Sequence, residues 1–268
     1  MSQQRHTPQK KWGQNFLRSS AAVEKIADAV QARPDETVLE IGPGEGVLTR
    51  ALLQRGGRVT AIEIDPMLAE RLAAEFGSEA RFTLIHADAL ESELPPGPFV
   101  AVGNLPYNVA NPIIRRVIAS SHCRRAVFMV QKEVADRIVA KAGDEDYGFF
   151  SIVVRLHADA RRLLTLEPGA FFPRPKVRST VVTFDRSDRV PAARRETITD
   201  IASRAFQTRR KMMRNSLEDF RGIPRDAWSA IFQEAGLRDD ARPEQLELED
   251  YERLAVILDR LEPSVLPE

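Results

Sequence analysis

Short apolar runs alternate with stretches of helical spacing along the first half of the chain. The runs have the length of buried strands and fall at 37–41, 58–64, 82–85, 99–103 and 127–130. Apolar positions repeat with helical spacing at 21–31 and again at 47–55. Regular alternation of this kind predicts an α/β fold with a doubly wound, mostly parallel sheet, and a binding site at the carboxyl ends of its strands.

The pattern becomes less regular beyond residue 130. A helix is expected at 132–142, and a last pair of strands at 161–166 and 179–184 brackets a proline-containing loop. Residues 151–156 are ambiguous, because their β-branched side chains favour a strand while helix remains open. The loop between the last two strands is expected to cover the substrate side of the binding site.

A second, smaller domain is predicted near the end of the chain. The polar, proline-bearing segment at 186–193 indicates a boundary. Helical spacing follows at 196–206, 212–220, 227–235 and 246–261. The sequence therefore predicts an N-terminal arm at 1–20, an α/β domain at 21–188 and a small all-helical domain at 189–268. The first nine residues and the tail after residue 262 are expected to be mobile.

Composition narrows the class of protein. With 43% hydrophobic residues among 268, the chain can form one large core and a satellite domain. Its single cysteine, Cys123, excludes an intramolecular disulfide and a cysteine zinc cluster, and the four histidines lack metal-ligand spacing, so no metal is expected. The sequence shows no membrane-spanning run and no signal peptide, which predicts a cytoplasmic protein. No motif implies a dimer, and a monomer is expected.

A glycine-rich turn follows the first predicted strand. Gly42, Gly44 and Gly46 alternate with other residues, and a helix-like stretch comes next. Such a turn lets the backbone approach a nucleotide-type ligand closely. The dinucleotide fingerprint requires a further glycine where Val47 stands, and no Gly-Lys-Ser/Thr is present for a triphosphate. The turn therefore favours a nucleoside cofactor of another kind.

Two carboxylates follow the next strands of the pattern. Glu63 ends the second strand, roughly 20 residues beyond the first glycine, where an acid holds ribose hydroxyls in nucleotide-binding folds. Asp88 follows the third strand and could accept a hydrogen bond from an adenine amino group. The alternative is that both are solvated carboxylates at strand ends.

The segment Asn104-Leu105-Pro106-Tyr107 directly follows the strand at 99–103. An aromatic amine is a poor nucleophile because its lone pair is delocalised into the ring, and two hydrogen-bond acceptors can make it more tetrahedral. The Asn104 side-chain oxygen and the Leu105 carbonyl, held by the fixed φ of Pro106, are such acceptors. The Tyr107 ring could stack on an extruded base. The alternative is an ordinary turn that closes a buried strand.

The set of motifs, in this order, resembles the ribosomal RNA adenine N6-dimethyltransferases, the KsgA family, across nearly the whole chain. The likeness is carried by 13–17 (Gly-Gln-Asn-Phe-Leu), 40–44 (Glu-x-Gly-x-Gly), 104–107 (Asn-Leu-Pro-Tyr), 131–133 (Gln-Lys-Glu) and 171–177 (Phe-Phe-Pro-Arg-Pro-Lys-Val). It implies a Rossmann-like class I methyltransferase domain, a small helical domain, a helix at 151–156 and S-adenosylmethionine as cofactor. It also implies dimethylation of N6 of two adjacent adenosines in a hairpin loop near the 3′ end of small-subunit (16S) ribosomal RNA, with a role in small-subunit biogenesis.

The resemblance also assigns residues to roles. The implied cofactor contacts are Asn15, Leu17, Gly42, Gly44, Glu63, Asp88 and Asn104. The implied catalytic residues are Asn104, Leu105, Pro106, Tyr107 and Phe171. Phe171 would provide a second ring against the target base, although the adjacent Phe172 leaves that assignment open. A place in the core is the alternative for either phenylalanine.

Charge distribution bears on the RNA partner. The 39 basic and 39 acidic residues cancel, which is unusual for a protein that binds phosphate backbones. Basic residues nevertheless gather in three places, and the RNA contacts expected from them are Lys10, Lys11, Arg174, Lys176, Arg209, Arg210 and Lys211. For 209–214 the alternative is an ordinary solvated helix face. The expected partner is ribosomal RNA within a small-subunit precursor.

The N-terminal segment 10–17 carries Trp12, Phe16 and Leu17, and it is apolar enough to fold back over the site. We expect it to be mobile without ligand and ordered with it, acting as a lid that excludes water. A frayed arm is the alternative.

Three other functions remain open from the sequence. One is an antibiotic-resistance methylase that modifies large-subunit ribosomal RNA, which 208–211 (Thr-Arg-Arg-Lys) and the acidic tail disfavour. Another is a ribosome-assembly factor whose catalysis is dispensable. The third is a nicotinamide-dependent enzyme, which the missing third glycine disfavours.

Overall fold

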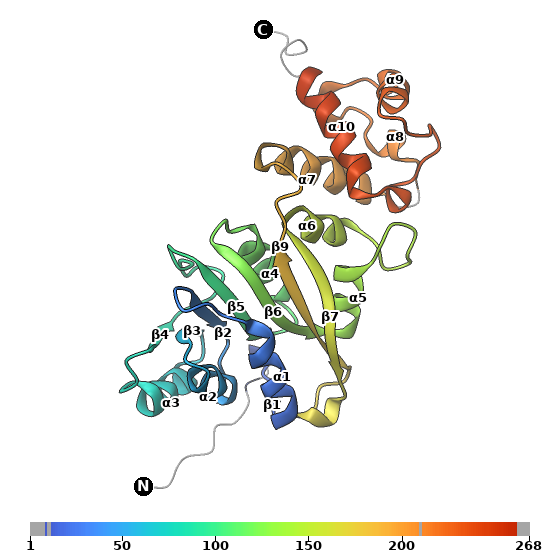
Figure 1. The fold of residues 1–268 in the computed structure, drawn as a ribbon. Helices are drawn as coiled ribbons and strands as arrows, with labels where there is room; N and C mark the ends of the chain where they lie inside the picture. Colours follow the sequence, from blue (N-terminus) through green and yellow to red (C-terminus); the bar gives the residue numbers. More distant parts are fainter. Residues whose placement is uncertain (1–8, 10–11, 209–210, 262–268) are drawn as a thin grey trace. The chain divides into compact units, whose positions relative to one another are not determined.

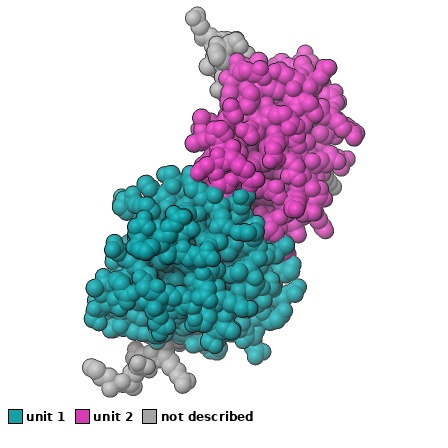
Figure 2. Space-filling model, in the orientation of Figure 1, with its two compact units in different colours: residues 1–135, 159–186 teal, residues 136–158, 187–268 magenta. Residues whose placement is uncertain are grey.

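The computed structural model describes residues 9, 12–208 and 211–261. The chain divides into two compact units, one made of residues 1–135 and 159–186 and the other of residues 136–158 and 187–268 (Figure 2). The longer segment of the second unit begins at residue 187, within two residues of the boundary expected after residue 188. The second unit also includes residues 136–158, so the predicted continuous domain at 21–188 does not coincide with the first unit.

A seven-stranded sheet forms the first unit, with the strand order β4-β3-β2-β5-β6-β9-β7 (Figure 1). Strands β2 to β6 are mutually parallel, and β9 pairs with β6 in the antiparallel sense. The bounds are β2 Thr37–Ile41, β3 Arg58–Glu63, β4 Phe82–His86, β5 Phe99–Asn104, β6 Cys123–Gln131, β7 Ala158–Leu166 and β9 Ser179–Arg186. The predicted α/β fold with a mostly parallel sheet is confirmed.

The strand order reverses at the centre of the sheet. β2 lies between β3 and β5, so the chain leaves β2 towards one edge and later returns to its other side. In open α/β sheets the crevice at such a switch point is where ligands bind. The topology therefore places the ends of β2, β3 and β5 beside one site.

Helices of the first unit pack on this sheet through regular apolar stripes. The five buried residues of α1, at 22, 23, 26, 27 and 30, form one apolar stripe along the helix. The Ser19 side chain caps its first turn by accepting from Ala22 N. Asp65 caps α3 in the same way, accepting from Met67 N at 3.0 Å. The helix bounds are α1 Ser20–Val30, α2 Val47–Gln54, α3 Pro66–Phe76 and α4 Ala110–Ala119. The residues of α5, Lys132–Val139, belong partly to the first unit and partly to the second.

A small second sheet was not predicted. β1 (Phe16–Leu17) pairs antiparallel with β8 (Phe171–Phe172), so the N-terminal segment lies against the loop between β7 and β9. A short 3-10 helix, η2 Pro168–Ala170, leads into β8. Two strands of two residues carry no periodic signal, and only their long-range pairing creates them.

The second unit is helical and has its own core. Trp228, Tyr147 and Tyr251 are fully buried in that core, and both tyrosine hydroxyls donate to backbone carbonyls, those of Leu246 and Pro243. Its helices are α6 Phe149–His157, α7 Ala192–Phe206, α8 Met213–Ser216, α9 Ala227–Glu234 and α10 Leu248–Leu261, with short 3-10 turns η3 Phe220–Gly222 and η4 Pro243–Gln245. The helix inferred from the family resemblance at 151–156 is confirmed.

The helix expected at 212–220 is wrong in length. α8 covers only Met213–Ser216, and the chain then turns through left-handed conformations at Asp219 (φ 58°) and Arg221 (φ 54°). Non-glycine residues rarely adopt such angles inside a helix.

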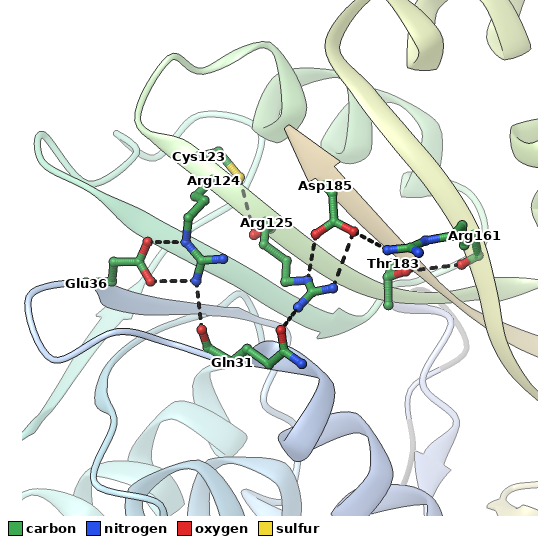
Figure 3. Close-up of polar contacts among 8 residues, drawn as sticks. All are labelled: Gln31, Glu36, Cys123, Arg124, Arg125, Arg161, Thr183 and Asp185. Carbon is green, nitrogen blue, oxygen red and sulfur yellow. Dashed lines mark hydrogen bonds and ion pairs between the residues drawn. The ribbon is translucent and has the colours of Figure 1, made fainter. Parts of the chain in front are cut away.

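A cluster of charged residues lies where the amino end of β6 meets the carboxyl end of β9 (Figure 3). Arg124 binds the buried Glu36 with two hydrogen bonds of 2.5 and 2.7 Å, and this pairing lowers the pKa of Glu36. Arg125 and Arg161 both bind Asp185, which joins β6, β7 and β9. These contacts tie the connection between α1 and β2 to β6 on the side opposite the carboxyl ends of the strands.

Candidate active site

A cavity of about 230 Å³ opens at the carboxyl ends of β2, β3 and β5. Its walls come from the N-terminal segment, the turn after β2, the end of β3, the loop after β4 and the end of β5. The sequence-predicted residues that line it are Asn15, Leu17, Gly42, Gly44, Glu63, Asp88, Asn104 and Pro106. Every predicted cofactor residue thus reaches one cavity, although the segments that supply them are far apart in the chain.

Gly42, Gly44 and Gly46 all have left-handed φ angles, of 67°, 59° and 75°. A Cβ atom on Gly44 would lie 3.1 Å from the ring of Phe16, and one on Gly46 would lie 2.7 Å from the ring of Phe76. The glycines therefore permit both the backbone conformation and the close approach of β1 and α3. The turn leaves its backbone facing the cavity, as a bound nucleoside requires.

Glu63 joins this turn to the end of β3. Its carboxylate accepts from Gly44 N at 3.1 Å and from Asp65 N at 3.0 Å. Burial raises the pKa of Glu63, and the two backbone donors oppose that rise. Each carboxylate oxygen can accept a further hydrogen bond, so the group can still hold hydroxyls from the cavity side.

Asp88 lies in the loop after β4, and Arg116 of α4 binds the backbone of the same loop. The Asp88 side chain accepts from Leu90 N at 2.8 Å through Oδ1. The Arg116 guanidinium donates to the carbonyls of Ala89, at 2.6 Å, and Ser92. Sequence reasoning missed Arg116, because nothing in the spacing of α4 shows that it faces a loop more than twenty residues earlier.

Asn104 ends β5 and lines the cavity. Its side-chain Nδ2 donates to the Asn15 carbonyl at 2.7 Å, so the amide nitrogen is engaged by the N-terminal segment. This bond fixes the orientation of the amide and leaves the side-chain oxygen as the acceptor. Gly103 precedes it, and a Cβ there would lie 2.4 Å from the Ile41 carbonyl, which shows how closely β5 approaches β2.

The rest of the 104–107 segment has three different environments. Leu105 is buried and donates from its backbone to Met129 O at 3.1 Å. Pro106 lines the cavity. Tyr107 is partly buried, its hydroxyl lies 3.0 Å from Ser179 Oγ, and burial raises its pKa. The phenol group is thus anchored to β9, and the orientation of the ring is fixed.

The two phenylalanines of β8 differ in exposure. Phe171 is only 3% exposed and belongs to the hydrophobic core of the first unit, whereas Phe172 is 56% exposed. Among the described residues, neither Phe171 nor Tyr107 lines the cavity. A base could stack on Phe171 only after that side chain had turned out of the core, so its predicted role stays a prediction.

The N-terminal segment is bound to the site through a second contact. Gln14 Nε2 donates to Asp65 Oδ2 at 2.7 Å, and Asp65 is fully buried at the start of α3. Together with the Asn15–Asn104 bond, this contact holds residues 13–17 against the cavity. Whether the segment closes as a lid stays a prediction.

Glu40 is a buried acid that the sequence reasoning did not assign to a role. It is 1% exposed, lines the cavity and accepts from Thr49 Oγ1 at 2.6 Å. Burial raises its pKa to about 7. Burial therefore favours the protonated form of this carboxyl group, which lies next to the glycine turn.

The basic residues expected to contact RNA are only partly described. Arg174 and Lys176 are exposed on the loop after β8, and Lys211 is exposed in the second unit. Lys10, Lys11, Arg209 and Arg210 lie outside the described residues. Within the described ranges, no group of three or more histidine, cysteine, aspartate or glutamate side chains could hold a metal ion. No helix within those ranges is long and apolar enough to cross a membrane.

Comparison with known proteins gives consistent matches. The family model of the ribosomal RNA adenine dimethylases matches residues 5–260. The ribosomal RNA small subunit methyltransferase A of Pseudomonas savastanoi pv. phaseolicola is 36% identical over 274 residues, covering 99% of this chain and 99% of that protein. The protein of the same name from Kineococcus radiotolerans is 40% identical, covering 92% of this chain and 85% of that protein.

Two solved structures are also similar. The 23S rRNA methyltransferase ErmE is 30% identical with a TM-score of 0.72, covering 91% of this chain and 100% of that chain. A dimethyladenosine transferase from Plasmodium falciparum has a TM-score of 0.82, covering 91% of this chain and 98% of that chain. Its identity is 22%, so this second likeness bears on the fold alone.

Proposed function

Because the chain belongs to the ribosomal RNA adenine dimethylase family and is an S-adenosylmethionine-dependent methyltransferase, we propose that it dimethylates N6 of two adjacent adenosines in small-subunit ribosomal RNA. The target is a hairpin loop near the 3′ end of that RNA. The observation that carries the proposal is the Asn104 amide, which the Asn15 carbonyl orients beside a cavity lined by Glu63 and Asp88.

The cavity residues fit the cofactor. S-adenosylmethionine supplies an activated methyl group on a sulfonium. The glycine turn would bring its backbone close to the cofactor, Glu63 would hold the ribose hydroxyls, and Asp88 would accept a hydrogen bond from the adenine amino group. Asn15 and Leu17 line the cavity on the N-terminal side and would help to exclude water from the bound cofactor.

The adenosine amine is activated by acceptors, not by a strong base. The Asn104 oxygen and the Leu105 carbonyl each accept a hydrogen bond from N6, and together they direct its lone pair towards the methyl group. Tyr107 stacks on the extruded base, with its hydroxyl held by Ser179. The site motifs contain no histidine, and water accepts the proton released after transfer.

We favour RNA of the small ribosomal subunit as the substrate over RNA of the large subunit. The curated relatives named for the small subunit are 36% and 40% identical to this chain, whereas the large-subunit enzyme ErmE is 30% identical. We extend the proposal to a small-subunit precursor as the bound particle, to a role in its maturation, to a cytoplasmic location and to a monomeric enzyme. The arm, the α/β domain and the helical domain are proposed to serve as lid, catalytic domain and RNA contact, respectively.

The test is a labelling assay with purified protein, labelled S-adenosylmethionine and separate unmethylated small and large subunits. We expect dimethyladenosine from the small subunit alone. Label in large-subunit RNA would move the chain to the resistance methylases, and no label despite cofactor binding would favour an assembly factor. Asn104→Ala should lower turnover by about 10³-fold or more while cofactor affinity falls much less, because it removes an acceptor for the reacting amine.

A further inference from the structure

Phe172 is a large apolar side chain exposed at the rim of the site. Its ring is 56% exposed, and it lies directly opposite Phe16 in the β1–β8 pairing. Residues directly opposite in an antiparallel pair place their side chains on the same face. Phe16 lines the cavity, so Phe172 lies on the same face of this strand pair, beside a residue of the cavity wall.

Arg18 adds a charged plane to this ring. Its guanidinium carbon lies 5.8 Å from the Phe172 ring centroid, within cation–π distance. The Arg18 backbone donates to Ala170 O at 2.8 Å, and its side chain binds Glu45, a cavity residue, at 2.8 Å. Both the aromatic ring and the guanidinium are therefore held at the cavity entrance.

The loop that follows Phe172 is basic. Residues 172–178 (Phe-Pro-Arg-Pro-Lys-Val-Arg) carry Arg174, Lys176 and Arg178 and no acid, and all three cations are exposed. An exposed ring beside a basic loop is the composition of single-stranded nucleic-acid sites, where bases stack on aromatic rings and cations follow the phosphates. Protein interfaces, in contrast, are depleted in lysine.

We propose that Phe172 and Arg18 form a stacking platform for an unpaired base that flanks the target adenosine, with Arg174 and Lys176 on the adjoining phosphates. This site is separate from the one that holds the target base at Tyr107. The inference rests on the proposed function, because it requires an RNA loop to enter the cavity mouth.

The experiment uses the full chain and a small-subunit hairpin RNA with 2-aminopurine placed at one loop position at a time. Stacking on a ring quenches this fluorophore. We expect quenching at a position next to the target in the wild type, its loss in Phe172→Leu, and its return in Phe172→Trp. Phe172→Leu should weaken RNA binding about 10-fold without changing its salt dependence, whereas Arg174→Gln with Lys176→Gln should reduce the salt slope.

Met67→Ala is the matched control, because Met67 is also an exposed apolar residue, at 43%, on a different element. Unchanged quenching and affinity in Phe172→Leu would overturn the platform. The platform would also be overturned if Phe172→Leu bound the hairpin normally but bound assembled subunits weakly. That result would place a ribosomal protein, and not a base, on the Phe172 ring. Methylation by the wild type is measured in the same samples to keep the two proposals distinct. Absence of methylation would contradict the proposed function, whereas methylation without a Phe172 effect would contradict only the platform.

Discussion

At the scale of single residues, the polar groups of the site are held by one another and by backbone donors. Asn104 is oriented by Asn15, Glu63 by two backbone donors, and Asp88 by a loop that Arg116 holds. A catalytic group whose orientation is already fixed loses little entropy when the substrate arrives. The most informative variants therefore change the supporting residues as well as those that touch ligand.

Arg116→Gln should weaken binding of S-adenosylhomocysteine about 5- to 10-fold, because the loop that positions Asp88 loses the guanidinium contacts. Calorimetric titration measures the change. Arg115→Gln is the matched control, since the neighbouring arginine is exposed on the same helix. The penalty should shrink for a cofactor analogue that lacks the adenine amino group, and an equal penalty for both ligands would contradict a role through Asp88.

Glu40→Gln should change how stability depends on pH. Burial raises the pKa of Glu40 from 4.5 to about 7, so between these values the folded protein binds more protons than the unfolded chain. The contribution of Glu40 to the free energy of unfolding therefore falls as pH rises from about 4.5 to about 7.

Glutamine does not titrate, so the stability of the Glu40→Gln variant lacks this dependence on pH. From pH 5 to pH 8 its free energy of unfolding should therefore rise, relative to that of the wild type, by on the order of 2–3 kcal/mol. Urea unfolding of both proteins at the two pH values measures it. Parallel pH profiles would contradict the assigned pKa.

At the scale of elements, long-range polar contacts decide how helices and loops meet the sheet. The Arg124–Glu36 pair fixes the chain between α1 and β2 to β6 (Figure 3). The Glu36 side chain is 2% exposed, whereas Arg161, which binds Asp185, is 70% exposed. Buried and exposed ion pairs contribute differently to the free energy of unfolding, because water screens only the exposed pair.

Arg124→Ala should lower the free energy of unfolding by about 2–3 kcal/mol at pH 7, since it leaves a buried carboxylate without its cation. Arg161→Ala, the control, should cost about 0.5 kcal/mol or less. The pKa of Glu36 is lowered by Arg124, so the Arg124 effect is present above pH 4.5 and should diminish as pH falls below it. Equal losses in the two variants would contradict the distinction.

The N-terminal segment is the element for which a change of state is expected. Gln14 donates to Asp65 and the Asn15 carbonyl accepts from Asn104, and both contacts lie next to the cavity. We predict that bound cofactor increases hydrogen-exchange protection of residues 12–17 relative to α1. Equal protection with and without cofactor would contradict the lid.

At the scale of the whole molecule, neutrality and RNA binding are compatible because charge is unevenly distributed. The formal net charge is zero. The loop at 172–178 nevertheless contains basic residues and no acidic ones, and the segment 209–211 consists of three basic residues in succession. Phosphate contacts depend on local cations, and acids elsewhere in the chain reduce them little beyond a Debye length.

Replacing Arg209, Arg210 and Lys211 with alanine should weaken binding of small-subunit RNA and lower the salt slope by up to about one per phosphate contact removed. Filter binding across salt concentrations measures both quantities. Cofactor affinity serves as the control and should not change. RNA binding with an unaltered slope would show that this segment is an ordinary solvated surface.

The sequence by itself determined the features that depend on neighbours in the chain. Strand and helix periods, the glycine turn and the 104–107 segment are set by local spacing, and the structure confirms the parallel sheet they predicted. The sequence did not reveal the β1–β8 pairing, the early end of α8 or the inclusion of residues 136–158 in the second unit.

Tertiary structure alone decided which side chains meet. Asn104 and Asn15 are 89 residues apart, and Arg116 reaches a loop 27 residues earlier, so no periodic pattern links them. Burial also decided that Phe171 packs inside while Phe172 is exposed, although the two residues are identical in chemistry. Local sequence sets the conformation of a segment, but exposure and hydrogen-bond partners depend on the strand order that brings distant segments together.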